Sequence, residues 1–368
     1  MEELPPLETW LGSWSGFRGL TVAVVGDLVA DRYLYARPTR PSREAPLVVL
    51  REEAEEVLPG GAANTARNAR ALGARTLLLG CVGRDAAGHA VLDRLGADGV
   101  GLGAVRALDT WETPIKTRVL AGEHDRGLQQ VLRLDREPAG PPPRDEVERV
   151  GDALVALAGE VDAVVLSDYG YGTCGRSLAA AVARFRERSD APVVLDPRHR
   201  FTSYRGVAAM TPNREDLARA VGQPAERLQD PELLRRAAHL VLGKAGPGLL
   251  LVTLGKGGMA LFGQGLPAEG VSLPAFGGRG VVDVTGAGDT AAATFALGLA
   301  AGLAGPAAMV LANAAAGVTV MKHGAEVCSP AELRALFADL SPDVTAHLRR
   351  ATAAPADLPD GVGRLDLV

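Results

Sequence analysis

Residues 283–302 read Asp-Val-Thr-Gly-Ala-Gly-Asp-Thr-Ala-Ala-Ala-Thr-Phe-Ala-Leu-Gly-Leu-Ala-Ala-Gly. The two glycines allow the backbone to approach a ligand closely, and the residues after them predict a helix without charges. The first amides of such a helix lie at its positive end, which suits a phosphate or a developing anion. Asp289, in the first turn, is placed to accept a proton from a hydroxyl group. Because the same helix end favours the ionised carboxylate, we expect a weak base that relies on its position.

The same motif permits two other interpretations. Gly-Ala-Gly before Asp289 can be a plain turn with an acidic residue at the start of a helix. Through Ala291 it also fits the Gly-x-Gly-x-x-Ala form of the dinucleotide fingerprint, which normally lies in the first βα unit of a chain. A carboxylate between those glycines and a pyrophosphate would repel it. A Walker-type phosphate loop is excluded, because Ala follows Gly243-Lys244 and Gly follows Gly255-Lys256 where that loop needs Ser or Thr.

The uncharged stretch continues to Met321 and is long enough for a membrane span. It is mostly Ala and Gly, however, and Gly305-Pro306 interrupts it where a helix should stop. Two buried helices, at 289–302 and 306–321, explain the pattern better. The N-terminus lacks the charged and apolar regions of a signal peptide, so we expect a cytoplasmic protein without membrane contact.

The composition is that of a globular protein. Of 368 residues, 47% are hydrophobic and 23% are charged, and the net charge of −5 lacks the basic footprint of a nucleic-acid-binding protein. Cys81, Cys174 and Cys328 lie far apart, which supports neither a disulfide framework nor a cysteine-based zinc site.

Working outward from the motif, short apolar runs alternate with helical patterns. We expect strands at 21–25, 76–82, 163–166, 193–195 and 249–253. We expect helices at 62–72, 86–95, 145–158, 176–188 and 231–242. This alternation predicts an α/β fold of three layers, with a predominantly parallel sheet between two layers of helices.

Two segments, at about 33–58 and 112–136, depart from this alternation of strands and helices. We interpret both as β excursions that form a small lid on a main domain spanning 19–340. An N-terminal extension (1–18) and a C-terminal tail (341–368) flank that domain. The lid segments carry a surplus of cations: Arg37, Arg40, Arg43, Lys116, Arg118 and Arg133.

Polar residues follow the strands at their carboxyl ends, where open α/β sheets bind ligands. They are Asp27, Asp31, Asp168, Asp196, Asn213 and Thr253. A second glycine motif, Gly60-Gly61-Ala-Ala-Asn64, precedes a predicted helix. Asn64 is a poor residue for that helical position by propensity, and a hydrogen bond to a sugar hydroxyl would explain it.

Taken together, these motifs resemble the ribokinase/PfkB family of sugar kinases, from about Thr21 to Phe337. The matching patterns are Gly60-Gly61-x-x-Asn64, the Gly73…Gly83 spacing, Gly83-x-Asp85-x-x-Gly88, Thr253-x-Gly255-x-x-Gly258 and Asp283-x-x-Gly286-Ala287-Gly288-Asp289. Within the family, the chain most resembles the kinase half of bacterial bifunctional heptose 7-phosphate kinase/heptose 1-phosphate adenylyltransferases. No His-x-Gly-His motif is present, so the resemblance implies a kinase without the adenylyltransferase half.

The resemblance implies a ribokinase-like fold and a role for each motif residue. Asp289 is the expected base, with Gly286, Ala287 and Gly288 supplying amides to the transferred phosphoryl group. The expected substrate-binding residues are Asp27, Asp31, Gly60, Gly61, Asn64, Lys116, Arg118, Arg133 and Asp168. The expected nucleotide-binding residues are Asn213, Thr253, Gly255, Gly258 and Asn313. Mg²⁺ would be served indirectly by Glu215 or Asp216, because the family's Asn-x-x-Glu reads Asn-Arg-Glu-Asp here. A K⁺ site is expected near Asp283 and Thr285.

The resemblance further implies transfer of phosphate from ATP to O1 of D-glycero-D-manno-heptose 7-phosphate, giving the 1,7-bisphosphate, a step toward ADP-heptose for lipopolysaccharide. A homodimer joined through the lids is expected. Related heptose kinases carry Lys at the position of Tyr171 and Pro at that of Arg43, which leaves the substrate open. The alternatives are a kinase of another sugar or nucleoside, and a regulator that binds sugar or nucleotide without catalysis.

Overall fold

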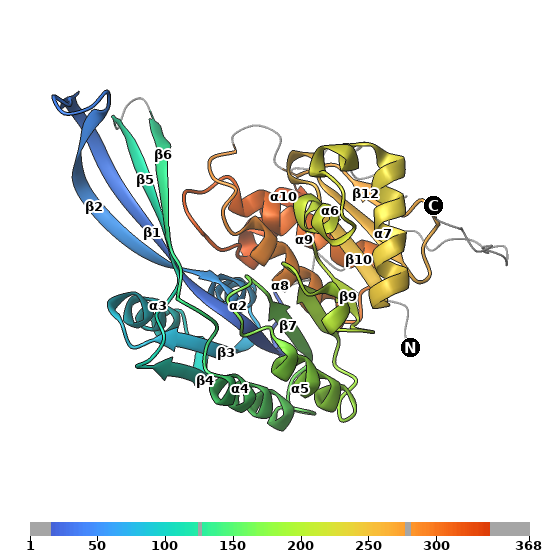
Figure 1. Cartoon of the computed structure of the whole chain (residues 1–368). Coiled ribbons are helices and arrows are strands. Elements are labelled where there is room, and N and C mark those ends of the chain that lie inside the picture. The colour runs from blue at the N-terminus through green and yellow to red at the C-terminus, as the bar shows by residue number, and fades with distance from the viewer. Residues whose placement is uncertain (1–15, 124–126, 277–280, 339–368) are drawn as a thin grey trace.

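A computed structural model of the chain describes residues 16–123, 127–276 and 281–338. Its centre is a sheet with helices on both faces (Figure 1). The strand order is β12 (Val271–Leu273), β11 (Met259–Gly263), β10 (Leu249–Thr253), β9 (Ala209–Met210), β8 (Val193–Asp196), β7 (Ala163–Ser167), β1 (Thr21–Pro41), β3 (Arg75–Gly83) and β4 (Gly101–Leu108).

The sheet is parallel from β9 and β10 across to β4, and β11 and β12 extend this row of strands antiparallel. Every residue of β7 is buried, as expected of a strand covered on both faces. Val24 of β1 pairs with Leu78 of β3 on one side and with Val165 of β7 on the other. The carboxyl ends of these parallel strands therefore meet at one edge of the sheet.

Two apolar clusters fill the spaces between the sheet and its two helical layers. One layer contains α2 (Ala62–Ala71), α3 (Ala86–Ala97), α8 (Ala287–Ala300), α9 (Gly305–Thr319) and α10 (Pro330–Ala338). The other contains α4 (Arg144–Ala156), α5 (Arg176–Arg186), α6 (Arg214–Ala220) and α7 (Pro231–Ala245). The predicted three-layer α/β fold with a mostly parallel sheet is confirmed.

The long uncharged stretch forms two buried helices, α8 and α9, as the sequence predicts. Their small residues allow close packing, because a Cβ added to Gly298 would lie 2.9 Å from the Cβ of Ala308. In the part of the chain that the structure describes, no helix is long and apolar enough to cross a membrane.

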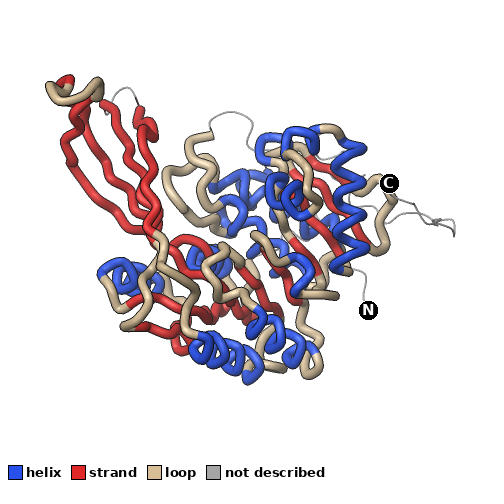
Figure 2. Tube along the Cα trace, in the orientation of Figure 1, coloured by secondary structure: helices blue, strands red, loops and turns tan. Residues whose placement is uncertain are grey.

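The lid is an extension of the central sheet. β1 is 21 residues long; its first part pairs with β3 and β7, and its remainder, from Leu28 onward, pairs with β2 (Val48–Gly61). β5 (Ile115–Glu123) runs parallel to β1 in this region, and β6 (Gly127–Arg136) pairs with β5. These four strands project away from the helices, as Figure 2 shows. The expected boundary between main domain and lid near residue 33 thus falls inside one continuous strand.

The expected N-terminal extension and C-terminal tail lie almost wholly outside the described residues. Of these two segments, the structure describes residues 16–18 alone. Phe17 packs in the core, and its amide donates to the carbonyl of Leu72 at 2.9 Å.

Candidate active site

Asp289 is buried in the first turn of α8, with 2% of its surface exposed, and both of its carboxylate oxygens accept hydrogen bonds. Asn64 donates its Nδ2 to Oδ2 at 2.9 Å. Tyr169 donates its hydroxyl to Oδ1 at 2.8 Å, and Thr65 donates to the same oxygen at 3.3 Å. The donors come from α2 and from the loop after β7, so three parts of the fold meet at this carboxylate.

The pKa of Asp289 is raised to about 6, mainly by burial; the hydrogen bonds from Asn64 and Tyr169 lower it, and the nearby Asp31 raises it. The expectation that Asp289 is a weak base does not match this result, because desolvation outweighs the hydrogen bonds that favour the ionised form. A carboxylate with a pKa near 6 is a stronger proton acceptor than an exposed one and is still mostly ionised at neutral pH.

The backbone at Gly286 packs closely against the side chain of Asn64. Gly286 caps α8 with a φ of 78°, and a Cβ at this position would lie 2.4 Å from Nδ2 of Asn64. Asn64 also accepts from Asn68, which in turn accepts from Thr290, so a buried chain of polar side chains links α2 to α8. A bond to the candidate base thus explains the poor helical position of Asn64, and its expected bond to sugar stays a prediction.

Asp27 organises a loop. Its carboxylate accepts hydrogen bonds from the backbone amides of Tyr169, Tyr171 and Thr173, at 2.9 to 3.0 Å. Three amide donors occupy most of the accepting sites of a fully buried carboxylate. Asp27 therefore holds the 169–173 loop in place, whereas the sequence predicted that it binds substrate.

Asp31 and Arg118 form a buried ion pair where the lid leaves the sheet. Arg118 Nη1 lies 2.6 Å from Asp31 Oδ1, and the guanidinium lies 5.4 Å from the ring centre of Tyr33. A Cβ on Gly60 would lie 2.2 Å from Asp31 Oδ2, and one on Gly61, whose φ is 59°, would lie 2.6 Å from the carbonyl oxygen of Asp27. The glycine pair is therefore required by the close approach of these two aspartates.

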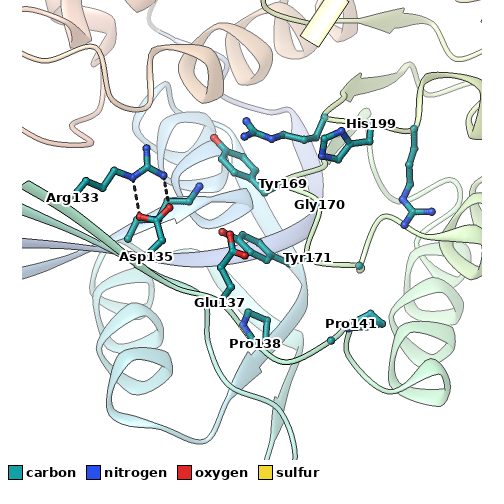
Figure 3. A pocket seen from close by; sticks show the side chains of 14 residues that line it. Arg133, Asp135, Glu137, Pro138, Pro141, Tyr169, Gly170, Tyr171 and His199 are labelled. Carbon is teal, nitrogen blue, oxygen red and sulfur yellow. Dashed lines mark hydrogen bonds and ion pairs between the residues drawn. The ribbon is translucent and has the colours of Figure 1, made fainter. Parts of the chain in front are cut away.

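A cavity of about 460 Å³ opens beside Tyr169, between the lid and the loops after β7 and β8. Its basic side chains are Lys116, Arg133, Arg198, His199 and Arg200. Lys116 Nζ lies 4.5 Å from the ring centre of Tyr169 and 5.8 Å from that of Tyr171. Figure 3 shows both tyrosines in the wall, with Arg133 paired to Asp135 through two hydrogen bonds.

The charges in this cavity act on one another. Burial lowers the pKa of Lys116 and Asp31 opposes this, while Arg133 and Arg198 lower it further. The lining has five basic side chains against two acidic ones, Asp135 and Glu137. Such a site favours a dianionic ligand.

Some of the cationic side chains predicted to bind substrate line the cavity, and others lie outside it. Lys116 and Arg133 line the cavity. Arg118 is committed to Asp31, and Arg43 is exposed in the turn between β1 and β2. The sequence analysis missed Arg198, His199 and Arg200, although their position directly after the β8 carboxyl end and Pro197 was a usable signal.

Asp168 lies beside the same loop and is buried. Its Oδ1 accepts from the amide of Gly170 at 3.0 Å, and its Oδ2 is buried without a hydrogen-bond partner among the described residues. The expected role of Asp168 in substrate binding stays a prediction.

The predicted nucleotide-binding residues gather around β10. Asn213 forms an isolated parallel bridge with Thr253, and Gly258, in the turn after β10, has a φ of 87°. A Cβ there would lie 2.0 Å from the carbonyl of Leu273, so only glycine fits. Gly255 is exposed at the start of the turn, and Asn313 of α9 donates to the carbonyl of Pro274 at 2.7 Å.

Carboxylates form a row between this region and Asp289. Burial raises the pKa of Asp196 well above its usual value, with further contributions from Asp289 and Asp216. Asp216 is buried and paired with Arg219 at 2.6 Å, whereas Glu215 is exposed. Among the described residues, no three acidic, His or Cys side chains are close enough to hold a metal ion by themselves. The row fits a divalent cation held mainly by phosphates and water.

Asp283 and Thr285 lie in the loop before α8. Asp283 Oδ1 accepts from the amide of Thr285 at 2.9 Å, and Oδ2 accepts from the amide of Gly324 at 3.2 Å. The carboxylate therefore joins two turns next to the helix start.

Comparison with known proteins gives a consistent result. Residues 20–332 match the pfkB family carbohydrate kinase. The chain is 40% identical over 322 residues to the bifunctional protein HldE of Azorhizobium caulinodans. The matched region covers 85% of this chain and 64% of the relative. It is 41% identical over 315 residues to HldE of Pseudomonas aeruginosa PAO1, and this match covers 85% of this chain and 62% of the relative. The chain thus spans less than two thirds of the length of these relatives.

Solved structures share the fold. Arabidopsis thaliana ribokinase, complexed with ribose and ATP, has 25% identity and a TM-score of 0.64, covering 88% of this chain and all of that one. Escherichia coli phosphofructokinase-2, in complex with potassium, has 17% identity and a TM-score of 0.69, covering 87% of this chain and 98% of that one.

Proposed function

This chain belongs to the pfkB family of carbohydrate kinases, and from that premise we propose that it phosphorylates O1 of a sugar that already carries a phosphate, namely a heptose 7-phosphate. It is a phosphotransferase that acts on sugar hydroxyl groups. The observation that carries the substrate proposal is the basic cavity lined by Tyr169, the residue whose hydroxyl donates to Asp289. A sugar whose hydroxyl faces Asp289 can place a distal phosphate among Lys116, Arg133 and Arg198.

In the proposed reaction the sugar hydroxyl attacks the γ-phosphorus of ATP, and Asp289 takes the hydroxyl proton. The first amides of α8 have no partner within the helix and lie where charge develops on the transferred group. Gly288, exposed in this turn, leaves that approach open, because nothing lies within 4 Å of a Cβ built there. Mg²⁺ would supply further charge neutralisation near Asp196 and Asp216.

The substrate proposal explains how the cavity tolerates Tyr171. The resemblance to heptose kinases implies Lys at this position, with Arg43 as a compensating cation. Arg43 lies in the exposed lid turn, whereas Arg198, His199 and Arg200 already supply positive charge in the cavity itself. We therefore assign the phosphate-binding role to these residues with Lys116 and Arg133.

An ATP-consumption screen of free sugars, nucleosides and sugar phosphates tests the proposal. We expect the highest kcat/KM for a heptose 7-phosphate. If free sugars match or exceed it, the phosphate assignment fails and the chain is a kinase of another sugar. ATP and sugar binding without turnover on any substrate would favour the regulator instead.

The proposed cofactors have separate tests. Turnover should require Mg²⁺ and disappear with excess chelator. A K⁺ site near Asp283 and Thr285 is proposed by analogy with the potassium complex of phosphofructokinase-2. Equal rates in potassium and tetramethylammonium salts would remove the K⁺ site.

We further propose a cytoplasmic homodimer joined through the lids. Five large apolar side chains of the lid are at least half exposed: Leu47, Val48, Val131, Leu132 and Leu134. A small sheet without a core gains stability by covering such a face. Light scattering should give the mass of a dimer, and Leu134→Glu should shift it toward the monomer. A monomeric wild type with full activity would contradict the proposal.

A further inference from the structure

We propose that Tyr169 is a positioning residue for the candidate base: its hydroxyl occupies Oδ1 of Asp289 and leaves Oδ2 as the oxygen that accepts the sugar proton. The expected change in kinetics rests on the proposed kinase function. The expected effect of the Tyr169 hydroxyl on the titration of Asp289 does not.

Counting donors assigns the two oxygens. A carboxylate oxygen has about two accepting sites. Oδ1 accepts from Tyr169 at 2.8 Å and from Thr65 at 3.3 Å, whereas Oδ2 accepts from Asn64 alone. Among the described residues, therefore, Oδ1 is the more crowded oxygen, with two hydroxyl groups within hydrogen-bond distance, and Oδ2, with one donor, has an accepting site left for a substrate hydroxyl.

Tyr169 is the dominant donor to Oδ1. Thr65 has a single hydroxyl proton, and the carbonyl of Gly61 lies 3.2 Å from the same hydroxyl. Tyr169 has no such competing acceptor in the described residues, and its bond is the shortest of the three to Asp289.

Tyr169 is itself held at its other end. Its backbone amide donates to Asp27 Oδ2 at 3.0 Å, and the same oxygen also accepts from Tyr171. The phenol ring is part of the cavity wall, 4.5 Å from Lys116 Nζ (Figure 3). One rigid side chain thus touches the base with its hydroxyl and forms the phosphate cavity with its ring.

The charged groups around Asp289 set the direction of the expected change. Asp31 of β1 and Asp196 of β8 oppose its ionisation, and Lys116 of β5 favours it. The Tyr169 hydroxyl adds a hydrogen bond to the ionised form. Removing that hydroxyl should raise the pKa of Asp289, so more of the base is protonated at a given pH.

Tyr169→Phe removes the hydroxyl and keeps the ring. We expect the acidic limb of the pH profile of kcat/KM to move up by about one pH unit, which lowers kcat/KM about twofold at pH 7 and about tenfold well below pH 6. The KM for the sugar phosphate should stay within about twofold, because the ring still forms the cavity wall. The loss should shrink above pH 8, whereas a merely structural defect would lower the rate equally at every pH.

Two comparison variants sharpen the test. Thr65→Val removes the weaker donor to Oδ1 and should shift the same limb by less. Tyr35→Phe removes a hydroxyl that donates to Glu56 in the lid at 3.3 Å and should leave the profile unchanged. An equal or larger shift from Thr65→Val would overturn the assignment of Tyr169 as the dominant donor.

A direct titration needs no turnover. In protein labelled with ¹³C at the aspartate carboxyls, the Asp289 signal is the one lost in Asp289→Asn. We expect its midpoint to rise in Tyr169→Phe by about one pH unit. An unchanged midpoint would overturn the inference, whereas a wild type inactive on every sugar would overturn the proposed function and leave this titration to decide the role of Tyr169.

Discussion

The floor of the active site and the lid above it are built in opposite ways. In the floor, Asp289, Asn64 and Thr65 are almost fully buried, and Asn64 and Thr65 both donate hydrogen bonds to Asp289. In the lid, ion pairs such as Arg37–Glu53 join side chains that are 52% and 41% exposed. The floor takes its geometry from the packed core, whereas the lid lacks a core and takes its position from the continuous backbone of β1.

This difference implies that single changes in the floor should have large effects and that similar changes in the lid should have small ones. It also implies that the lid gains from any surface that covers it.

The largest effect should come from the floor. Asp289→Asn should lower turnover by at least ~100-fold, the usual scale for a positioned base. Nucleotide affinity, measured by calorimetry, should stay nearly unchanged, because the predicted nucleotide-binding residues lie around β10. Near-normal turnover would remove Asp289 from its role.

The next largest effect should come from a buried ion pair in the helical layer. Arg67 is 3% exposed, lies 2.6 Å from Asp98 and also donates to the carbonyl of Ala325. Arg67→Ala should lower the free energy of unfolding by about 3 kcal/mol, because it leaves that carbonyl without its partner and Asp98 with only the longer ion pair to Arg94, at 3.6 Å. Chemical denaturation measures this directly.

The matched control lies in the lid. Arg37→Ala removes an exposed ion pair and should change the free energy of unfolding by at most about 1 kcal/mol. Equal losses in the two variants would show that the packed helical layer and the lid do not differ in the way we describe.

A third prediction concerns the cavity between the two regions. Arg198→Ala should raise the KM for a phosphorylated sugar by about 10- to 100-fold, the range for a lost hydrogen bond between charged groups. Free sugars should be affected far less, because they place no phosphate in the cavity. The same loss for both kinds of sugar would place Arg198 outside phosphate binding.

The last prediction concerns the dependence of kcat/KM on pH. Since burial raises the pKa of Asp289 to about 6, kcat/KM should fall about tenfold for each pH unit well below that value. The stability contribution has the opposite sign, because a raised folded-state pKa favours the protonated, folded protein. That contribution is complete below the unfolded value of 3.8 and is lost as the pH rises through 6. A flat rate profile between pH 5 and 7 would contradict the assigned base.

Local patterns predicted the elements well. Apolar runs gave the buried strands, and Gly305-Pro306 marked the break between α8 and α9. The sequence predicted the lid as two separate excursions from the main domain. Most strands are short, so a single strand of 21 residues, such as β1, was not expected.

Residue types and order along the chain thus determined the layered fold, the family and the identity of the candidate base. Only the tertiary structure decided which donor meets which acceptor: Asn64 bonds to Asp289, Arg118 to Asp31, and Asp27 to the 169–173 loop. The pKa of Asp289 was decided there too, because desolvation depends on everything packed around a group. Sequence spacing fixes the period of a helix or strand, but side chains more than a hundred residues apart meet only when the sheet brings its strand ends to one edge.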